Sequence, residues 1–229
     1  SDALSRAAKS EERGYRHSFD MLGEGARTAE DAKRYYKSYA DAIEQIGKWQ
    51  QKNKGASLLP DRMGISVKLS ALHPRYLATH KERVMAELVP LLLQLAQRAK
   101  DYQLNFTVDA EEADRLELSL AVIEAVFADP SLAGWDGFGL AIQAYQKRAG
   151  RVIDFIDGLC RKYDRRMMVR LVKGAYWDSE VKRAQGRGLA DYPVWTRKAA
   201  TDLSYLACAQ QMLAKRDRIF PQFATHNAL

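Results

Sequence analysis

The feature that most constrains the fold is a regular alternation of short apolar runs with amphipathic stretches. The apolar runs have the length of β-strands and occupy residues 17–23, 65–70, 105–111, 138–145, 167–173 and 220–227. The stretches between them repeat apolar residues every three or four positions, as helices do, over 29–51, 80–102, 112–128, 148–163 and 198–215. Thr28, Glu30 and Asp31 supply a start signal for the first of these helices. The alternation predicts parallel strands joined by crossover helices.

Two α/β architectures fit this pattern, an open doubly wound sheet and a (β/α)8 TIM-type barrel. Polar or charged residues close nearly every predicted strand: Asp20, Glu24, Lys68, Ser70, Asp109, Glu111, Gln143, Arg170, Lys173 and 225–227. A barrel assembles its site from the carboxyl ends of several strands, whereas an open sheet concentrates it at one switch point. No Gly-x-Gly-x-x-Gly motif follows any strand. The sequence therefore favours the barrel, as one domain over residues 1–229.

A complete barrel has eight strands, and the sequence predicts about six. Six strands of a barrel would leave two parallel edges open and part of the core uncovered. We therefore expect the chain to be a barrel whose last two strands and final helix are absent, either because it is a fragment or because further residues follow Asn227.

Composition narrows the functional classes. No apolar run reaches the roughly 18 residues of a membrane span, and the polar start is unlike a signal peptide, so a cytoplasmic location is expected. Neither the histidines nor the cysteines, Cys160 and Cys208, have metal-ligand spacing, and both cysteines are expected to be reduced core residues. The net charge of +7 makes an acidic partner such as nucleic acid worth testing, although the basic residues are interspersed with acids.

Two charged residues stand inside otherwise apolar strands. Lys68 and Asp109 lie on consecutive predicted strands, where a lone charge is costly unless it is paired or used. They form either a structural salt bridge across the barrel mouth or a cation–anion pair that frames a small polar ligand. Gln143 extends the same ring with an amide suited to the edge of a heterocycle.

The corner after the fifth strand has the residue types of a seat for a flat ligand. Arg170 presents a rigid fork of donors inside the strand, and Gly174 allows close approach of the backbone. Lys173 suits a phosphate, and a charged helix is expected to follow as far as Gln185. Tyr176 and Trp177 offer flat faces; the alternative is that both rings pack under that helix.

Two further segments add polar groups. Thr196, Arg197 and Lys198 precede a predicted helix and suit a pyrophosphate, while Thr225, His226 and Asn227 close the last strand. No serine elbow, phosphate-binding loop or close carboxylate pair is evident. Because the sequence supplies positioning groups without a nucleophile, it indicates redox chemistry carried out by a cofactor.

Several long motifs resemble the proline dehydrogenase domains of the bacterial proline utilization A family: "ISVKLSALHPRY", "VDAEEADRLELSL", "IQAYQKR", "RLVKGAYWDSEVKRAQ", "YPVWTRK" and "FATHNA". They cover nearly the whole chain in the family's order. The resemblance implies an FAD-dependent barrel that oxidises L-proline to Δ1-pyrroline-5-carboxylate by hydride transfer to the flavin N5. Electrons would pass to a membrane quinone, in the first step of proline catabolism to glutamate. It also implies peripheral contact of the full-length protein with the inner membrane, and no nucleic acid for this domain.

The resemblance also assigns roles by motif position. The proline site would be lined by Lys68, Asp109, Leu171 and Tyr176, with Arg170 near the flavin N5. The flavin would be held by Asp109, Gln143, Arg170, Val172, Lys173, Gly174, Ala175 and Trp177. Its phosphate and adenosine parts would be held by Thr196, Arg197, Lys198, Thr225, His226 and Asn227. Glu24 resembles a residue that forms a gating ion pair with a late arginine.

The chain departs from the family at its end. The family places two more strands, and a helix with two arginines for the proline carboxylate, after the motif that ends at Ala228. It also usually has histidine where this chain has Leu229. Without the arginine pair the carboxylate would bind poorly, so weak flavin binding and little turnover are expected of this polypeptide alone. An inactive structural fragment is the competing hypothesis.

Overall fold

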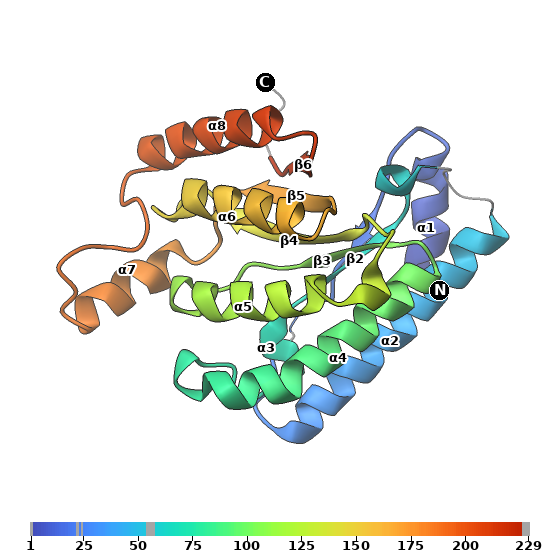
Figure 1. Ribbon diagram of the computed structural model, residues 1–229, viewed down its shortest axis with the longest axis horizontal. Coiled ribbons are helices and arrows are strands. Elements are labelled where there is room, and N and C mark those ends of the chain that lie inside the picture. The colour runs from blue at the N-terminus through green and yellow to red at the C-terminus, as the bar shows by residue number, and fades with distance from the viewer. Residues whose placement is uncertain (1, 22, 24, 54–57, 226–229) are drawn as a thin grey trace.

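The computed structural model describes residues 2–21, 23, 25–53 and 58–225 (Figure 1). Within them, six parallel strands form one sheet in the order of the chain. The strands are β1 (Ser18–Phe19), β2 (Gly64–Val67), β3 (Asn105–Val108), β4 (Phe138–Gln143), β5 (Met167–Val172) and β6 (Ile219–Phe223). A sheet in which every strand pairs with its sequence neighbour curls into part of a barrel.

Helices connect the strands and cover one face of this half-barrel. They are α1 (Asp2–Glu11), α2 (Ala29–Lys52), α3 (Leu69–Leu72), α4 (Lys81–Asp101), α5 (Leu116–Phe127), α6 (Ala149–Lys162), α7 (Trp177–Gly186) and α8 (Lys198–Ala214). Short 3-10 turns are η1 (Leu59–Asp61), η2 (Ala78–His80), η3 (Ala113–Arg115) and η4 (Pro130–Leu132). Figure 1 shows α2, α4, α5, α6 and α8 following one another along the sheet, whereas α7 lies out beyond its edge.

The predicted strands and helices are confirmed in place, but every strand ends earlier than predicted. β2, for example, stops at Val67, and the Lys68 N–H donates to the Tyr39 hydroxyl at 3.1 Å as α3 begins. Several of the polar residues that close the apolar runs, such as Lys68, Asp109 and Lys173, thus belong to loops, whereas Gln143 and Arg170 stay within β4 and β5. The start signal of α2 is a full capping box between Thr28 and Asp31. The sequence did not predict α1, which buries little beyond Leu4 and Ala7.

The main hydrophobic core lies between the sheet and its helices. On β5, Met167, Val169 and Leu171 belong to this core, while Arg170 and Val172 line a cavity on the inner face. The period of two along a strand therefore separates packing residues from site residues. Cys160 and Cys208 are buried and free, as the sequence predicts.

Within the residues described, none of the helices has the length and apolar character needed to cross a membrane. The same residues hold no cluster of three or more histidine, cysteine or carboxylate side chains suited to a metal ion.

Candidate active site

The carboxyl ends of the strands open into a cavity of about 640 Å³. A hollow of this size accommodates a small-molecule ligand or part of a cofactor. Ten of the residues singled out from the sequence line it: Lys68, Asp109, Gln143, Arg170, Val172, Lys173, Gly174, Ala175, Tyr176 and Thr225. They come from loops or strand ends far apart in the chain, because parallel strands bring their carboxyl ends to one edge.

A cluster of charges forms the floor of the cavity. The Lys68 Nζ lies 3.0 Å from Asp109 Oδ2 and 3.5 Å from Asp20 Oδ1. Arg170 Nη1 lies 3.5 Å from the other Asp109 oxygen. The salt bridge that the sequence left as one alternative is therefore present, and it faces the cavity. The two alternatives are therefore compatible, because an ion pair that faces a cavity can also frame a ligand.

Burial sets the protonation behaviour of this cluster. It raises the pKa of Asp109 above its ordinary value, even though the charge of Lys68 and its hydrogen bond act in the opposite direction. The carboxylate is held where ionisation is unfavourable, next to two cations. Such groups gather at functional sites more often than elsewhere.

Arg170 is fixed by contacts with three other strands or their loops. Its Nη1 donates to the Ser66 Oγ at 2.8 Å and its Nη2 to the Ser18 Oγ at 3.0 Å. With the contact to Asp109, the guanidinium spans the inner face from β1 to β5. Neither Ser18 nor the contribution of Ser66 to the site was predicted from the sequence. Ser66 was detectable, since it precedes Lys68 by two positions and so shares its face of the strand.

Gln143 connects two loops of the cavity wall. Its Nε2 donates to the Glu111 carbonyl at 2.8 Å, and its Oε1 accepts from the Ala175 N–H at 3.4 Å. The amide therefore holds the loop after β3 against the loop after β5. Gln143 also lines the cavity, so contact with a bound ring stays a prediction.

The corner after β5 is shaped by aromatic rings. Gly174 has φ +136°, and a Cβ at this position would lie 2.4 Å from the ring of Tyr145. The positive φ and the lack of space for a Cβ beside Tyr145 both require glycine at position 174. Burial raises the pKa of Tyr176, with Glu111 acting in the same direction. Trp177 is 42% exposed and donates from Nε1 to the Trp195 carbonyl at 2.9 Å, so it does not pack under α7.

A second hollow of about 430 Å³ adjoins the first. It is lined by Tyr145, Lys173, Gly174, Trp177, Thr196, Lys198 and Thr201. Two of these residues, Lys173 and Gly174, also line the first cavity. Asp202, which the sequence did not single out, receives contacts of 2.5 Å from both Lys173 and Lys198.

Some predicted site residues are not brought to these hollows. Leu171 is fully buried in the core between the sheet and the helices, so its side chain points away from the cavity. Arg197 precedes α8 in an extended conformation and is exposed, and it is not part of the lining of either hollow. Glu24, His226 and Asn227 lie outside the residues that the structure describes.

The fold and site define an α/β half-barrel whose polar residues converge at the carboxyl ends of the strands, as in barrel enzymes. The sequence model of the family "Proline dehydrogenase" matches residues 3–229. The chain therefore belongs to the proline dehydrogenase family, a family of oxidoreductases, and the resemblance drawn from its motifs is confirmed.

The relatives are much longer proteins. The chain is 56% identical to the bifunctional protein PutA of Klebsiella aerogenes over 99% of its own length and 17% of that protein. For the PutA of Rhizobium meliloti the identity is 53%, over 99% of this chain and 18% of the other. The chain thus spans less than a fifth of these relatives.

Solved structures of proline utilization A proteins share the fold of this chain. A mutant of Bradyrhizobium japonicum proline utilization A is 72% identical, with a TM-score of 0.89 over 93% of this chain and 21% of the other. The enzyme from Bdellovibrio bacteriovorus, inactivated by N-propargylglycine, is 27% identical, with a TM-score of 0.91 over 98% of this chain and 24% of the other.

Proposed function

We propose that this chain provides the site that oxidises L-proline to Δ1-pyrroline-5-carboxylate with FAD as the electron acceptor. The observation that carries the proposal is the cluster of Lys68, Asp109 and Arg170 at the floor of the cavity, in a chain of this family. The cluster offers both signs of charge to a zwitterionic amino acid. It contains no activated nucleophile, which suits a reaction whose difficult step belongs to a cofactor.

The two hollows fit an elongated, flat, phosphate-bearing cofactor. They adjoin at Lys173 and Gly174, so together they extend from Lys68 to Thr201. Small residues and backbone at positions 141, 174 and 175 leave space beside the inner face of β4 and β5. Lys173 and Lys198 supply cations for phosphate oxygens at the far end, where Asp202 holds both.

When bound, FAD would supply the acceptor for a hydride from C5 of proline, whose ammonium group must give up a proton so that the C=N bond can form. Arg170 would place a permanent positive charge beside the reacting part of the cofactor, because Ser18 and Ser66 prevent its fork from turning away. Gln143, Val172, Gly174, Ala175 and Trp177 would hold the cofactor along the strand ends, with Thr196 and Thr225 nearer its phosphate and adenosine parts.

The substrate would lie over the charge cluster. We assign the proline carboxylate to the side of Lys68, with Asp109 holding the ammonium group in place. Tyr176 would close one wall, since its half-buried ring lines the same cavity. This arrangement orients the ring of proline and excludes water from one side, which is what a hydride transfer requires of the protein.

The surroundings of β6 support a complete (β/α)8 barrel as the finer fold. On α8, Leu203, Leu206 and Leu213 are between 45% and 69% exposed, and Phe223 on β6 is 42% exposed. The spacing of the leucines puts them on one stripe of the helix. A further strand and helix packed against β6 and α8 would cover these side chains.

For the whole protein we propose the pathway that the resemblance to the family implies. Electrons would leave the flavin for a quinone, with peripheral contact at the inner face of the bacterial membrane, as the first step from proline to glutamate. The nucleic-acid alternative depended on net charge alone, and the described structure offers many of those charges a partner within the chain.

The test is the anaerobic visible spectrum of the purified full-length protein before and after L-proline is added. A yellow protein that proline bleaches would support cofactor, substrate and reaction together. N-Propargylglycine should then inactivate it, more slowly when proline is present. A yellow protein that proline leaves unchanged would contradict the substrate, and a colourless protein that FAD cannot restore would contradict the cofactor.

A further inference from the structure

Helix α7 carries Tyr176 and Trp177 at its start, yet apolar packing hardly holds it. Only Glu180 and Ala184 among its ten residues are buried. Burial of one alanine side chain contributes little to docking a helix, because the hydrophobic contribution scales with the apolar area removed from water. Polar contacts must therefore supply most of the attachment of α7 to the domain.

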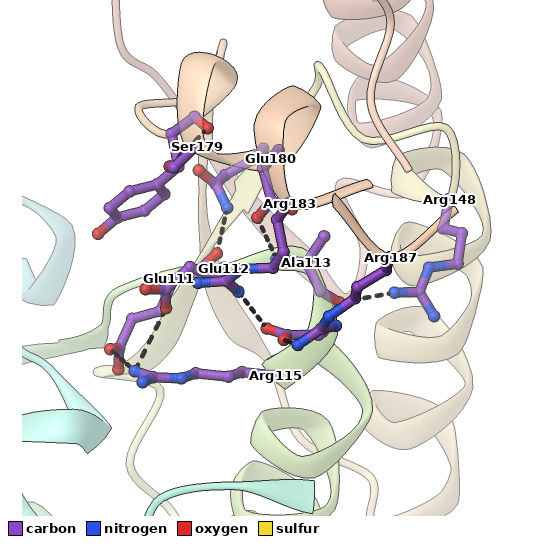
Figure 2. A network of polar contacts seen from close by, with 12 residues as sticks. Glu111, Glu112, Ala113, Arg115, Arg148, Ser179, Glu180, Arg183 and Arg187 are labelled. Atoms are coloured by element: carbon purple, nitrogen blue, oxygen red, sulfur yellow. Dashed lines mark hydrogen bonds and ion pairs between the residues drawn. The ribbon is translucent and has the colours of Figure 1, made fainter. Parts of the chain in front are cut away.

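Glu180 makes the central contact. Its side chain is 3% exposed, and its Oε1 accepts a hydrogen bond of 2.6 Å from the Ala113 N–H (Figure 2). Ala113 is the first residue of η3, and Glu112 before it provides no side-chain cap. A carboxylate 67 residues away thus accepts from a helix-start N–H that has no partner within the helix.

A ring of weaker contacts surrounds this bond. Asp114, next in η3, lies 2.9 Å from Arg183 and 3.3 Å from Arg187 on α7. Arg148, at the start of α6, donates to the Ala113 carbonyl at 2.8 Å (Figure 2). The ion pairs are a third or more exposed, so each stabilises the interface only modestly. The buried Glu180 contact is the strong member of the set.

The contact connects two walls of the cavity. The Glu180 N–H donates to the Tyr176 carbonyl at 2.9 Å, so the carboxylate is one helical turn from a residue that lines the cavity. The other wall, which carries Asp109, continues through Glu111 into η3. Gln143 connects these two walls where it lines the cavity. Glu180 connects them at a point that does not line the cavity.

We infer that Glu180 is a positioning residue, whose carboxylate holds the start of α7 against the loop after β3 and thereby fixes Tyr176 in the cavity wall. The inference rests on the proposed function, because it assigns Tyr176 to the substrate side of that cavity. Glu180 itself does not line either hollow, and it acts through the backbone of α7.

The experiment compares Glu180→Ala and Glu180→Gln with Asp178→Ala in the full-length, flavin-loaded protein. Asp178 is an exposed acid in the same helical turn and serves as the matched control. Hydrogen exchange followed by mass spectrometry reports the amides of 111–115 and 174–182, with β4 as an internal reference. Loss of a charge-assisted hydrogen bond corresponds to roughly 10- to 100-fold faster exchange in Glu180→Ala.

We expect faster exchange in both segments, a KM for proline raised about tenfold, and a kcat changed by less than about threefold. Glu180→Gln keeps an acceptor oxygen and should recover part of both effects, while Asp178→Ala should show neither. Unchanged exchange in Glu180→Ala would overturn the contact. Faster exchange with an unchanged KM would overturn the positioning role. A wild-type protein that proline does not reduce would instead overturn the proposed function.

Discussion

Helices α6 and α7 follow successive strands of the same sheet but are held in opposite ways. α6 buries seven of its 14 residues, mostly apolar side chains such as Ile153 and Ile156. α7 buries two of its ten residues and is held through Glu180, Asp114 and two arginines. Apolar attraction is non-directional, whereas a buried hydrogen bond depends on the direction between donor and acceptor. The helix next to the candidate site is the one that geometry holds.

The carboxylates of the two regions differ in the same sense. Burial alone would raise the pKa of Asp157 on α6, but hydrogen bonds from Arg161 and Lys215 outweigh it and lower the pKa. At the strand ends, burial prevails and raises the pKa of Asp109. Ionisation of Asp157 therefore stabilises the folded state, whereas ionisation of Asp109 destabilises it. Four measurements can break or sharpen this contrast.

The largest expected effect is on stability. Ile156→Ala removes a fully buried side chain from α6 and should lower the free energy of unfolding by about 2–5 kcal/mol in chemical denaturation. The exposed Arg151→Ala on the same helix should stay within about 0.5 kcal/mol. If Glu180→Ala destabilised the domain as much as Ile156→Ala, α7 would belong to the packed framework and the contrast would fail.

Asp109→Asn should lower kcat/KM for proline about 100-fold without loss of stability at neutral pH. A raised folded pKa means that the stabilising contribution is present at low pH and is lost as pH rises through that pKa. Asparagine cannot ionise, so the variant should be at least as stable as the parent at pH 7, with a difference that vanishes on acidification. Denaturation is measured at several pH values from 3 to 7. If Asp109 were a stabilising charge, the variant would instead be less stable than the parent at pH 7.

Asp157→Asn tests the reverse sign at α6. Its folded pKa lies below the ordinary 3.8, so its contribution is present above that value and is lost as pH falls through the folded pKa. We expect the variant to be about 1–2 kcal/mol less stable at pH 7, with the difference shrinking below about pH 4. A difference that stayed constant with pH would assign the loss to packing.

The smallest effect is expected from Arg187→Ala. The Arg187 side chain is 56% exposed and contacts Asp114 at 3.3 Å, while Arg183 holds the same carboxylate more closely. Stability should change by less than about 0.5 kcal/mol and the KM for proline should stay the same. A clear rise in KM would mean that the exposed arginines, rather than Glu180, position α7.

The sequence predicted the six strands and their parallel order because hydrophobic periodicity and strand–helix alternation are local signals. It also predicted that Lys68 and Asp109 pair and that Arg170 lies at the same edge, since the carboxyl ends of parallel strands share one edge. It could not predict individual hydrogen bonds between side chains that lie far apart in the chain. The bond from Arg170 to Ser18 spans 152 positions, and no periodicity encodes it.

The side chain of Leu171 was assigned to the proline site by motif position, yet the pleat of β5 turns it into the core. Motif position specifies a stretch of chain, whereas the face of a strand changes with each residue. The roles of the individual cavity residues remain predictions, which the spectral and kinetic experiments address.

The bond between Glu180 and Ala113 has a consequence for the evolution of this family. Its donor is a main-chain N–H, so exchange of Ala113 for serine or glycine leaves the bond intact. Only proline, which has no N–H, removes the donor outright. The bond therefore places no demand on the side chain at position 113, and a search for correlated substitutions at positions 113 and 180 would pass over a contact that joins two walls of the cavity.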